Sequence, residues 1–428
     1  FTVASLLCGA APNAGVLVAA RTIQGVGAAL MVPQVLTCIQ ALFTGRALVT
    51  AVGLYSLMLG IGVSAGQVLG GVLVTANPAG MGWRAVFLVN LPIGAAVLLM
   101  AGRVPRVRAV GRIPLDRAGT TLLALAMLLL LVPVTFGREY HWPAWTWPTL
   151  AASVGVGAWF VRTERRVAER GGAPLLHPDL ARAPGFLGGI AAIFVSYVGY
   201  GGLLFCVAVH LQTGLGYSPL RSGLAFVPYS FGFGAVNILW SRLPHTWHKW
   251  APVAGVGALI VANAAIAAAL TAGSGGWTGW DSALLALAGV GNGLSFGALV
   301  AQIVARVAPA HASGASGAIT TIVQLGIAVG VAAVGAVYLA GGSSTDPGAD
   351  ARGLATAAAA LAAAETLVLF LVVRVARAGS GVAVVTRPLV AVPAPASTVA
   401  ATAGAAKDPA GAELRATEPD ASMTCGQR

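Results

Sequence analysis

Long apolar stretches alternate with short polar loops along almost the whole chain. Several of these stretches reach the roughly 20 residues that an α-helix needs to cross a bilayer. The pattern therefore predicts an all-α integral membrane protein. We identify twelve apolar segments: 1–12, 14–40, 47–75, 85–102, 118–136, 148–161, 186–212, 221–241, 251–271, 281–305, 313–340 and 354–373.

One of these segments, 14–40, carries a charge inside its apolar run. Arg21 would lie roughly 10 Å from the outer end of that helix, at a rise of ~1.5 Å per residue. A charge at that depth is costly, so it should face protein or a water-filled cavity and have a partner. Gln24 follows one helical turn later. We expect the two residues to form a polar site within a helical bundle, with purely structural hydrogen bonding as the alternative.

The composition agrees with a membrane protein and excludes several other classes. Of 428 residues, 57% are hydrophobic and 9% are charged, against roughly 25% charged residues in a soluble domain. The net charge of +12 is spread over many loops, whereas a nucleic-acid-binding protein would gather it on one face. The four cysteines lie far apart and show neither a disulfide nor a zinc-ligand spacing.

The basic residues predict the orientation of the segments. Alternate loops carry sixteen arginine or lysine residues, and the opposite set carries four. Because cytoplasmic loops carry the excess of positive charge, the first set should be cytoplasmic. The protein would then be a multi-pass protein of the plasma membrane with a cytoplasmic C-terminus. Residues 378–428 are rich in Ala, Pro and Thr, and we expect them to form a disordered tail.

An internal repeat relates the two ends of the chain. At an offset of 264 residues, six glycines of the first half coincide with six of the second. The glycines Gly25, Gly27, Gly53, Gly62, Gly66 and Gly71 correspond to Gly289, Gly291, Gly317, Gly326, Gly330 and Gly335. Segments 14–40 and 47–75 thus correspond to 281–305 and 313–340, the fourth and fifth of six second-half segments.

The repeat predicts the domain organisation. Parallel six-helix repeats with binding sites between them are a common design of secondary transporters. We expect an N-terminal bundle at 1–102, a linker with two extra spans at 103–185 and a C-terminal six-helix bundle at 186–377. By this correspondence the first bundle lacks its first two helices, so the chain would hold about twelve of fourteen spans.

The order of several motifs resembles the major facilitator superfamily, specifically its 14-span drug:proton antiporter branch. RTIQGVGAALMVP from Arg21 resembles the fourth-helix motif, and LGIGVSAGQVLGG from Leu59 resembles the fifth-helix antiporter motif. GWRAVFLVNLPIG from Gly82 leads into the sixth helix as in this branch. LGYSPLRSGLAFVP from Leu215 and SGASGAITTIVQLGIAVG from Ser313 are similar to second-half stretches.

The resemblance implies the major facilitator fold and a proton-coupled exporter. It implies that Arg21 takes part in proton coupling, together with an acidic first-helix residue that this chain does not contain. The family usually has proline after the glycine of the fifth-helix motif, whereas Gln67 follows Gly66 here. The row Gly62, Gly66 and Gly70 should pack closely against a neighbouring helix and form a seam that moves during transport.

Other polar residues within the spans are candidates for coupling and substrate binding. Glu365 is the acidic residue at clear membrane depth, where it could carry a proton or simply be hydrogen-bonded. The other candidates are Tyr197, Tyr200, Asn237 and Asn292, which could line a substrate cavity or only make interhelical contacts. Asp116 and Asp281 begin spans and are expected to cap helices.

The sequence therefore predicts proton-coupled export of amphipathic or cationic small molecules by alternating access. No cofactor is expected, because the chain lacks a phosphate-binding Gly-Lys-Ser/Thr loop and an ion gradient would supply the energy. No metal site is expected at His245 and His248, which have no further ligand nearby.

The expected partners are a small-molecule substrate, protons and membrane lipids, with no nucleic acid, and the protein should be monomeric. A dedicated exporter of one metabolite and an inactive or non-transporting membrane protein are the alternatives to multidrug efflux. No paired catalytic motif suggests an enzyme.

Overall fold

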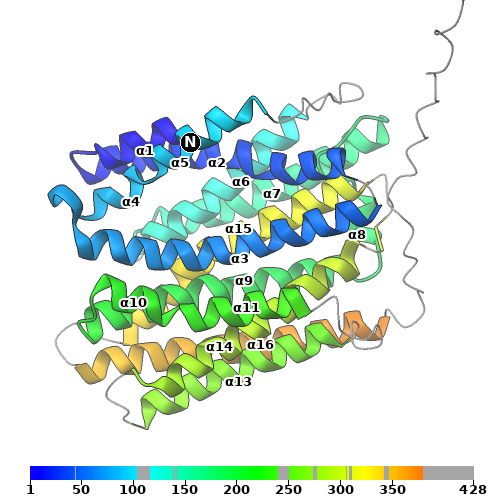
Figure 1. Cartoon of the computed structure of the whole chain (residues 1–428). Helices are drawn as coiled ribbons and strands as arrows, with labels where there is room; N and C mark the ends of the chain where they lie inside the picture. Colours follow the sequence, from blue (N-terminus) through cyan, green and yellow to red (C-terminus); the bar gives the residue numbers. More distant parts are fainter. Residues whose placement is uncertain are drawn as a thin grey trace, which may run out of the picture. The chain divides into compact units, whose positions relative to one another are not determined.

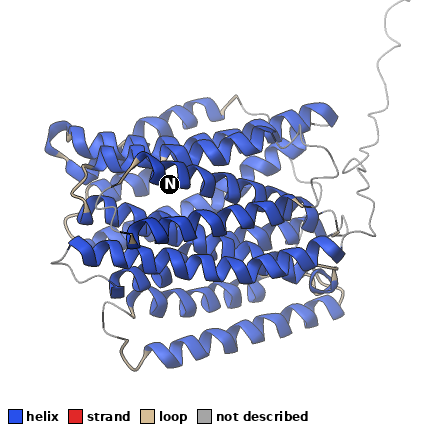
Figure 2. Ribbon diagram, turned by 90° about the horizontal axis from the view of Figure 1, so that it is seen from below, coloured by secondary structure: helices blue, strands red, loops and turns tan. Residues whose placement is uncertain are grey.

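Helices account for all the regular structure among the residues that the structure describes (Figure 2). The structure, a computed structural model, describes residues 1–43, 45–103, 116–137, 140, 142–239, 250–272, 277–304, 306–307, 311–341 and 347–378. This confirms the all-α prediction. Eight of the described helical stretches are long and apolar enough to cross a membrane.

Residues 1–169, as far as the structure describes them, contain seven α-helices and two 3₁₀ turns. They are α1 (Thr2–Gly9), α2 (Ala14–Leu42), α3 (Gly45–Ala76), η1 (Pro78–Gly80), η2 (Gly82–Arg84), α4 (Ala85–Leu88), α5 (Asn90–Ala101), α6 (Arg117–Phe136) and α7 (Thr146–Glu169). Of these, α7 continues well past the apolar segment 148–161, because its arginines and glutamates are good helix formers outside an apolar setting.

The second half follows after the short helix α8 (Asp179–Arg182). Its helices are α9 (Phe186–Val209), the π-helical turn η3 (His210–Gly214), α10 (Pro219–Ala225), α11 (Val227–Leu239), α13 (Ala251–Thr271), α14 (Gly279–Val304), α15 (Ala312–Gly341) and α16 (Pro347–Ala378). The predicted segments 251–271, 281–305 and 313–340 agree with α13, α14 and α15 within two residues at each end.

Two predicted segments are each divided into two helices by a proline. Segment 85–102 breaks after Leu88, and segment 221–241 breaks at Phe226. Pro92 and Pro228 lie four residues after Leu88 and Leu224 and have no N–H to donate to those carbonyl groups. The interruption is therefore local, and each pair of helices continues across it.

Side-chain caps fix where several helices begin. The carboxamide of Asn13 accepts a hydrogen bond from Val16 N at 3.0 Å, and Asp116 accepts one from Gly119 N at 2.8 Å. The hydroxyl of Ser218 accepts from Arg221 N at 3.3 Å. Such caps satisfy N–H groups that have no partner within the helix, and the predicted capping role of Asp116 is confirmed.

The second-half helices pack extensively against one another. α9 packs along α15, α13 packs against both α14 and α16, and α11 packs against α14 (Figure 1). More than half of the apolar stretches of α9 and α14 are buried, whereas only a small share is buried in α2, α5 and α6. The exposed apolar faces of those three helices suit contact with lipid.

Close backbone contacts join α3 to the second half. A Cβ atom on Gly71 would lie 2.6 Å from the carbonyl oxygen of Pro219, and one on Gly223 would lie 2.7 Å from that of Gln67. The Leu220 N–H also donates to the hydroxyl of Thr75 at 3.2 Å. α3 therefore meets α10 main chain to main chain, and it also packs against α11.

We predict that Gly330→Ala lowers the thermal stability of the protein. A Cβ atom at Gly330 would collide with the Val198 carbonyl oxygen of α9, and overpacking of this kind costs about 1–3 kcal/mol. Gly317→Ala is the matched control on the same helix, since no described atom lies within 4 Å of the added Cβ atom. Thermal unfolding in detergent measures both variants; equal melting temperatures would contradict the close packing of α9 and α15.

Candidate functional site

Arg21 belongs to a hydrogen-bonded polar group that joins α1 and α2. Its Nη1 donates to Gln24 Oε1 at 2.7 Å, and Gln24 Nε2 donates to Ser5 Oγ at 2.7 Å. Gln24 and Ser5 are buried. The structure thus brings together the two residues expected from the sequence and adds Ser5, which lies in the short segment 1–12 and has no distinguishing pattern.

The guanidinium of Arg21 is held by neutral partners. The Arg21 side chain is exposed at one side, and its Cζ lies 5.5 Å from the centre of the Phe87 ring. Within the described residues no carboxylate forms an ion pair with Arg21. The arrangement leaves the guanidinium available to an acid or an anionic group.

Glu365 is buried in the middle of the second-half bundle. Its side chain is 2% exposed, and Asn263 Nδ2 of α13 donates to Oε1 at 3.1 Å and to Oε2 at 3.0 Å. A Cβ atom on Gly199 would lie 3.1 Å from Oε1, so the carboxyl group also lies against α9. The sequence did not indicate Asn263, because an asparagine within an alanine-rich helix carries no pattern of its own.

Four aromatic rings from three helices meet beside this carboxyl group. Tyr197 and Tyr200 of α9 have ring centres 5.6 Å apart. Tyr197 also contacts Phe296 of α14 at 5.1 Å, and Tyr200 contacts Tyr229 of α11 at 5.9 Å. The predicted residues Tyr197 and Tyr200 thus lie together, and Tyr229 and Phe296 join them through the packing of helices distant in the sequence.

Several polar atoms around the rings lack a hydrogen-bond partner among the described residues. They are the hydroxyl of Tyr229, Nδ2 of Asn292 and the hydroxyl of Ser196, all buried. Buried polar groups in proteins are nearly always paired, so these three atoms are candidates for binding water, a ligand or residues outside the described part of the chain. The side chain of Asn237, a further predicted cavity residue, lies outside the described part of α11. A hollow of about 540 Å³ lies elsewhere, beside Phe370 and Arg374 of α16.

The predicted glycine seam is open in this structure. No described atom lies within 4 Å of a Cβ atom added at Gly62, Gly66 or Gly70, and Gln67 is exposed. The close approach on α3 occurs instead at Gly71, on a neighbouring face. In the second half, Gly289 and Gly293 do approach α11 closely. The expected movement along the row in α3 stays a prediction.

A second polar group links η3, α15 and α16. His210 Nδ1 lies 2.8 Å from Asp350 Oδ2, and the hydroxyl of Tyr338 donates to Asp350 Oδ1. His210 is 4% exposed. The sequence gave no indication of this group, because its three residues lie on separate helices.

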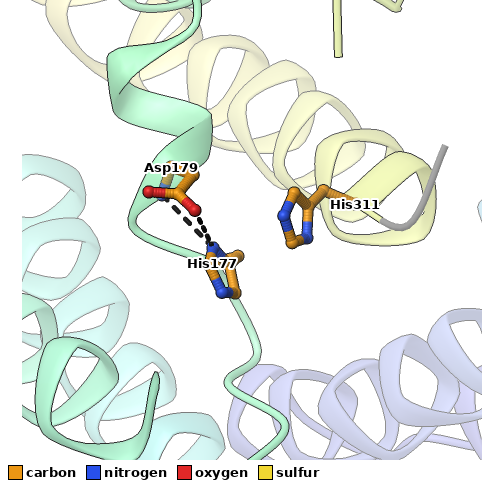
Figure 3. A group of neighbouring side chains, drawn as sticks. All are labelled: His177, Asp179 and His311. Carbon is orange, nitrogen blue, oxygen red and sulfur yellow. Dashed lines mark hydrogen bonds and ion pairs between the residues drawn. The ribbon is translucent and has the colours of Figure 1, made fainter. Parts of the chain in front are cut away.

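His177, Asp179 and His311 form the one group of potential metal ligands within the described residues (Figure 3). His177 Nδ1 lies 3.4 Å from Asp179 Oδ2, and the two imidazole rings stack with centres 4.0 Å apart and planes inclined by 20°. A coordinating imidazole directs its lone pair within the ring plane, so two nearly parallel rings do not converge on one ion. The arrangement favours ring stacking over coordination. His245 and His248 lie outside the described residues.

Comparison with known proteins places this architecture in a family. Residues 1–331 match the model of the Major Facilitator Superfamily. The chain belongs to the Major Facilitator Superfamily. Its helices are therefore those of an integral membrane transporter fold, as the sequence motifs indicated.

The similar members of the superfamily carry the names of drug and antibiotic exporters. The chain is 37% identical to the "Probable actinorhodin transporter" of Streptomyces coelicolor, over 79% of this chain and 59% of the relative. It is 33% identical to the cephamycin export protein CmcT of Amycolatopsis lactamdurans, over 78% of this chain and 68% of the relative. A Salmonella typhimurium relative with a multidrug resistance name is 29% identical, over 78% of this chain and 69% of that protein. The chain thus spans roughly three fifths to two thirds of the lengths of these superfamily members.

We predict that Asn263 and Glu365 of this superfamily member are energetically coupled. Asn263→Ala leaves the buried carboxyl group without a donor and should lower stability by about 1–3 kcal/mol. Glu365→Leu in the Asn263→Ala background should recover part of that loss, because the unpaired polar group is then gone. Thermal unfolding of both single variants and of the double variant completes a double-mutant cycle. Strictly additive changes in stability would show that the contact between Asn263 and Glu365 contributes nothing.

Proposed function

We propose that this chain forms part of a proton-coupled exporter of amphipathic or cationic small molecules that works by alternating access. The observation that carries the proposal is that one bundle buries both a carboxyl group, Glu365, and an adjacent aromatic cluster with unpaired polar atoms. A carboxyl group inside a membrane bundle is a functional candidate by default. The names of the relatives support export as the direction.

The aromatic cluster supports the substrate class. The faces of Tyr197, Tyr200 and Tyr229 attract cations and stack on flat rings. The unpaired Tyr229 hydroxyl and Asn292 amide can hydrogen-bond to oxygen atoms of a substrate. A substrate that offers both an aromatic or cationic part and a few acceptors matches this lining.

The polar group around Arg21 supports a role in coupling. Among the described residues its guanidinium donates a hydrogen bond to Gln24, and it can pair with an acidic residue of another helix during the cycle. In this proposal Glu365 carries the proton, and the gradient supplies the energy without a cofactor. The positive-inside pattern supports a plasma-membrane location with a cytoplasmic C-terminus. In this proposal the protein acts as a monomer. Its partners are protons, substrate and lipid, and nucleic acid has no role.

A dedicated exporter of one metabolite is the second candidate. The names of the actinorhodin and cephamycin relatives each refer to a single antibiotic. A narrow exporter would need hydrogen bonds that match one substrate, and the unpaired Tyr229 and Asn292 atoms could provide them.

We predict that Glu365→Gln abolishes substrate-evoked proton movement. Glutamine can keep a hydrogen bond with Asn263 but cannot exchange a proton at physiological pH. In inverted vesicles that contain the protein as its gene encodes it, substrate should raise the lumenal pH; Glu365→Gln and Arg21→Ala should each reduce this signal at least about tenfold. Glu169→Gln, an exposed position on α7, should retain it.

Each outcome of this assay has a definite meaning. Normal coupling in Glu365→Gln would remove Glu365 from the proton path. A response to a single metabolite would favour the dedicated exporter. No response to a broad panel from folded, inserted protein would overturn the transport proposal in favour of a non-transporting protein.

We predict that Tyr200→Ala weakens the binding of cationic dyes more than that of uncharged ones. Cation–π contacts contribute about 0.5–2 kcal/mol, so the dissociation constant should rise by about 2–30-fold for cations. Tyr200→Phe keeps the ring face and serves as the control. Fluorescence titration of purified protein measures both; equal losses for charged and neutral dyes would show that Tyr200 only packs.

A further inference from the structure

Two carboxyl groups meet where α6 begins and α7 ends, outside the two bundles. Asp116 caps α6 through Oδ1, which accepts from Gly119 N at 2.8 Å. Glu164 lies near the end of α7, and its Oε2 accepts from Leu176 N at 2.7 Å. One oxygen of each carboxyl group is thus bound to a main-chain N–H group.

The other two oxygens face each other without a donor. Asp116 Oδ2 and Glu164 Oε1 are both buried and have no hydrogen-bond partner among the described residues, and Glu164 as a whole is 2% exposed. A Cβ atom on Gly119 would collide with Glu164 Oε1 and lie 2.6 Å from Asp116 Oδ2. The absence of a side chain at Gly119 therefore leaves the space in which the two oxygens approach.

Facing acceptors of this kind need a proton between them. Two ionised carboxylates at close range repel each other in a buried setting, while one shared proton makes one group the donor and the other the acceptor. The N–H groups of Gly119 and Leu176 stabilise the negative charge that remains. We propose that Asp116 and Glu164 bind a single proton between them and thereby fasten the α6–α7 hairpin to the segment that follows α7.

The electrostatics of Glu164 agree with this arrangement. The residue lies beyond the apolar segment 148–161, and burial raises the pKa of Glu164 to about 7. The charge and hydrogen bond of Asp116 add to the increase, while the Leu176 N–H group opposes it. Because the folded-state pKa is raised, the folded protein binds the proton more tightly than the unfolded chain does. Stability is then lost as pH rises from about 4.5 to about 7.

Four arginines and one histidine lie close to Asp116 and Glu164 in the sequence. Arg117 on α6 and Arg162, Arg165 and Arg166 on α7 are exposed, and His177 follows the bound Leu176 by one residue. None of these forms an ion pair with Asp116 or Glu164 within the described chain. α15, which packs against α6, contains no Asp, Glu, Lys, Arg or His between Ala312 and Gly341.

The site is tested by the pH dependence of thermal stability in the purified full-length protein. The melting temperature of the wild type should show a transition in which it falls as pH rises from about 4.5 and levels off above about 7. Glu164→Gln keeps a neutral donor beside Asp116 and should remove that transition, so that the variant melts above the wild type at about pH 8.5. Glu169→Gln, which alters an exposed carboxylate on the same helix, should keep the wild-type curve.

A second measurement needs no variant. Leu176 is tied to Glu164, so proteolytic cleavage between Gly171 and Pro178 in native membranes should become faster as pH rises through about 7. A wild-type melting curve that does not fall between about pH 4.5 and about 7, or one that Glu164→Gln leaves unchanged, would overturn the proposal. So would full restoration of stability at high pH by millimolar Mg²⁺ or Ca²⁺, since the pair would then be a cation site.

Discussion

Polar groups inside these helices have to find their partners within the protein, because the hydrocarbon of a membrane offers none. That constraint determines where the chemistry of this chain can lie. Gln24 is held between Arg21 and Ser5, and Glu365 is held by Asn263, so each polar side chain also fixes the position of its neighbour. The Tyr229 hydroxyl and the Asn292 amide nitrogen, which have no partner among the described residues, are therefore the atoms on which the proposed substrate contacts rest.

Glycine lets the same helices approach closely enough for such partners to meet. Gly199 leaves room for the Glu365 carboxyl group, and Gly119 does the same for Glu164. In both cases a side chain at the glycine would occupy the space of a carboxyl oxygen. Small residues thus serve two purposes here: they allow close helix packing, and they create the few buried spaces that accommodate an acid.

The sequence predicted the helices and the Arg21–Gln24 contact, because hydropathy and helical spacing are local properties. It could not predict the partners of Glu365 or Tyr200, since Asn263 and Tyr229 are brought to them by tertiary packing across distant segments. Asp116 was recognisable as a cap from its place before a helix. Glu164, by contrast, stands among arginines that suggest an ordinary charged loop, and only the fold shows it facing Asp116. The breaks at Leu88 and Phe226 followed from prolines whose effect depends on position within an otherwise apolar run.

The contact of α3 with α10 is made largely by main-chain atoms at Gly71 and Gly223. Because this contact depends little on side chains, residues that line a substrate path can change during evolution without disturbing the contact between the two halves. What must be preserved is the pair of glycines and the hydroxyl of Thr75. A side chain at either glycine would push α3 away from α10, whichever residues lie elsewhere on these helices.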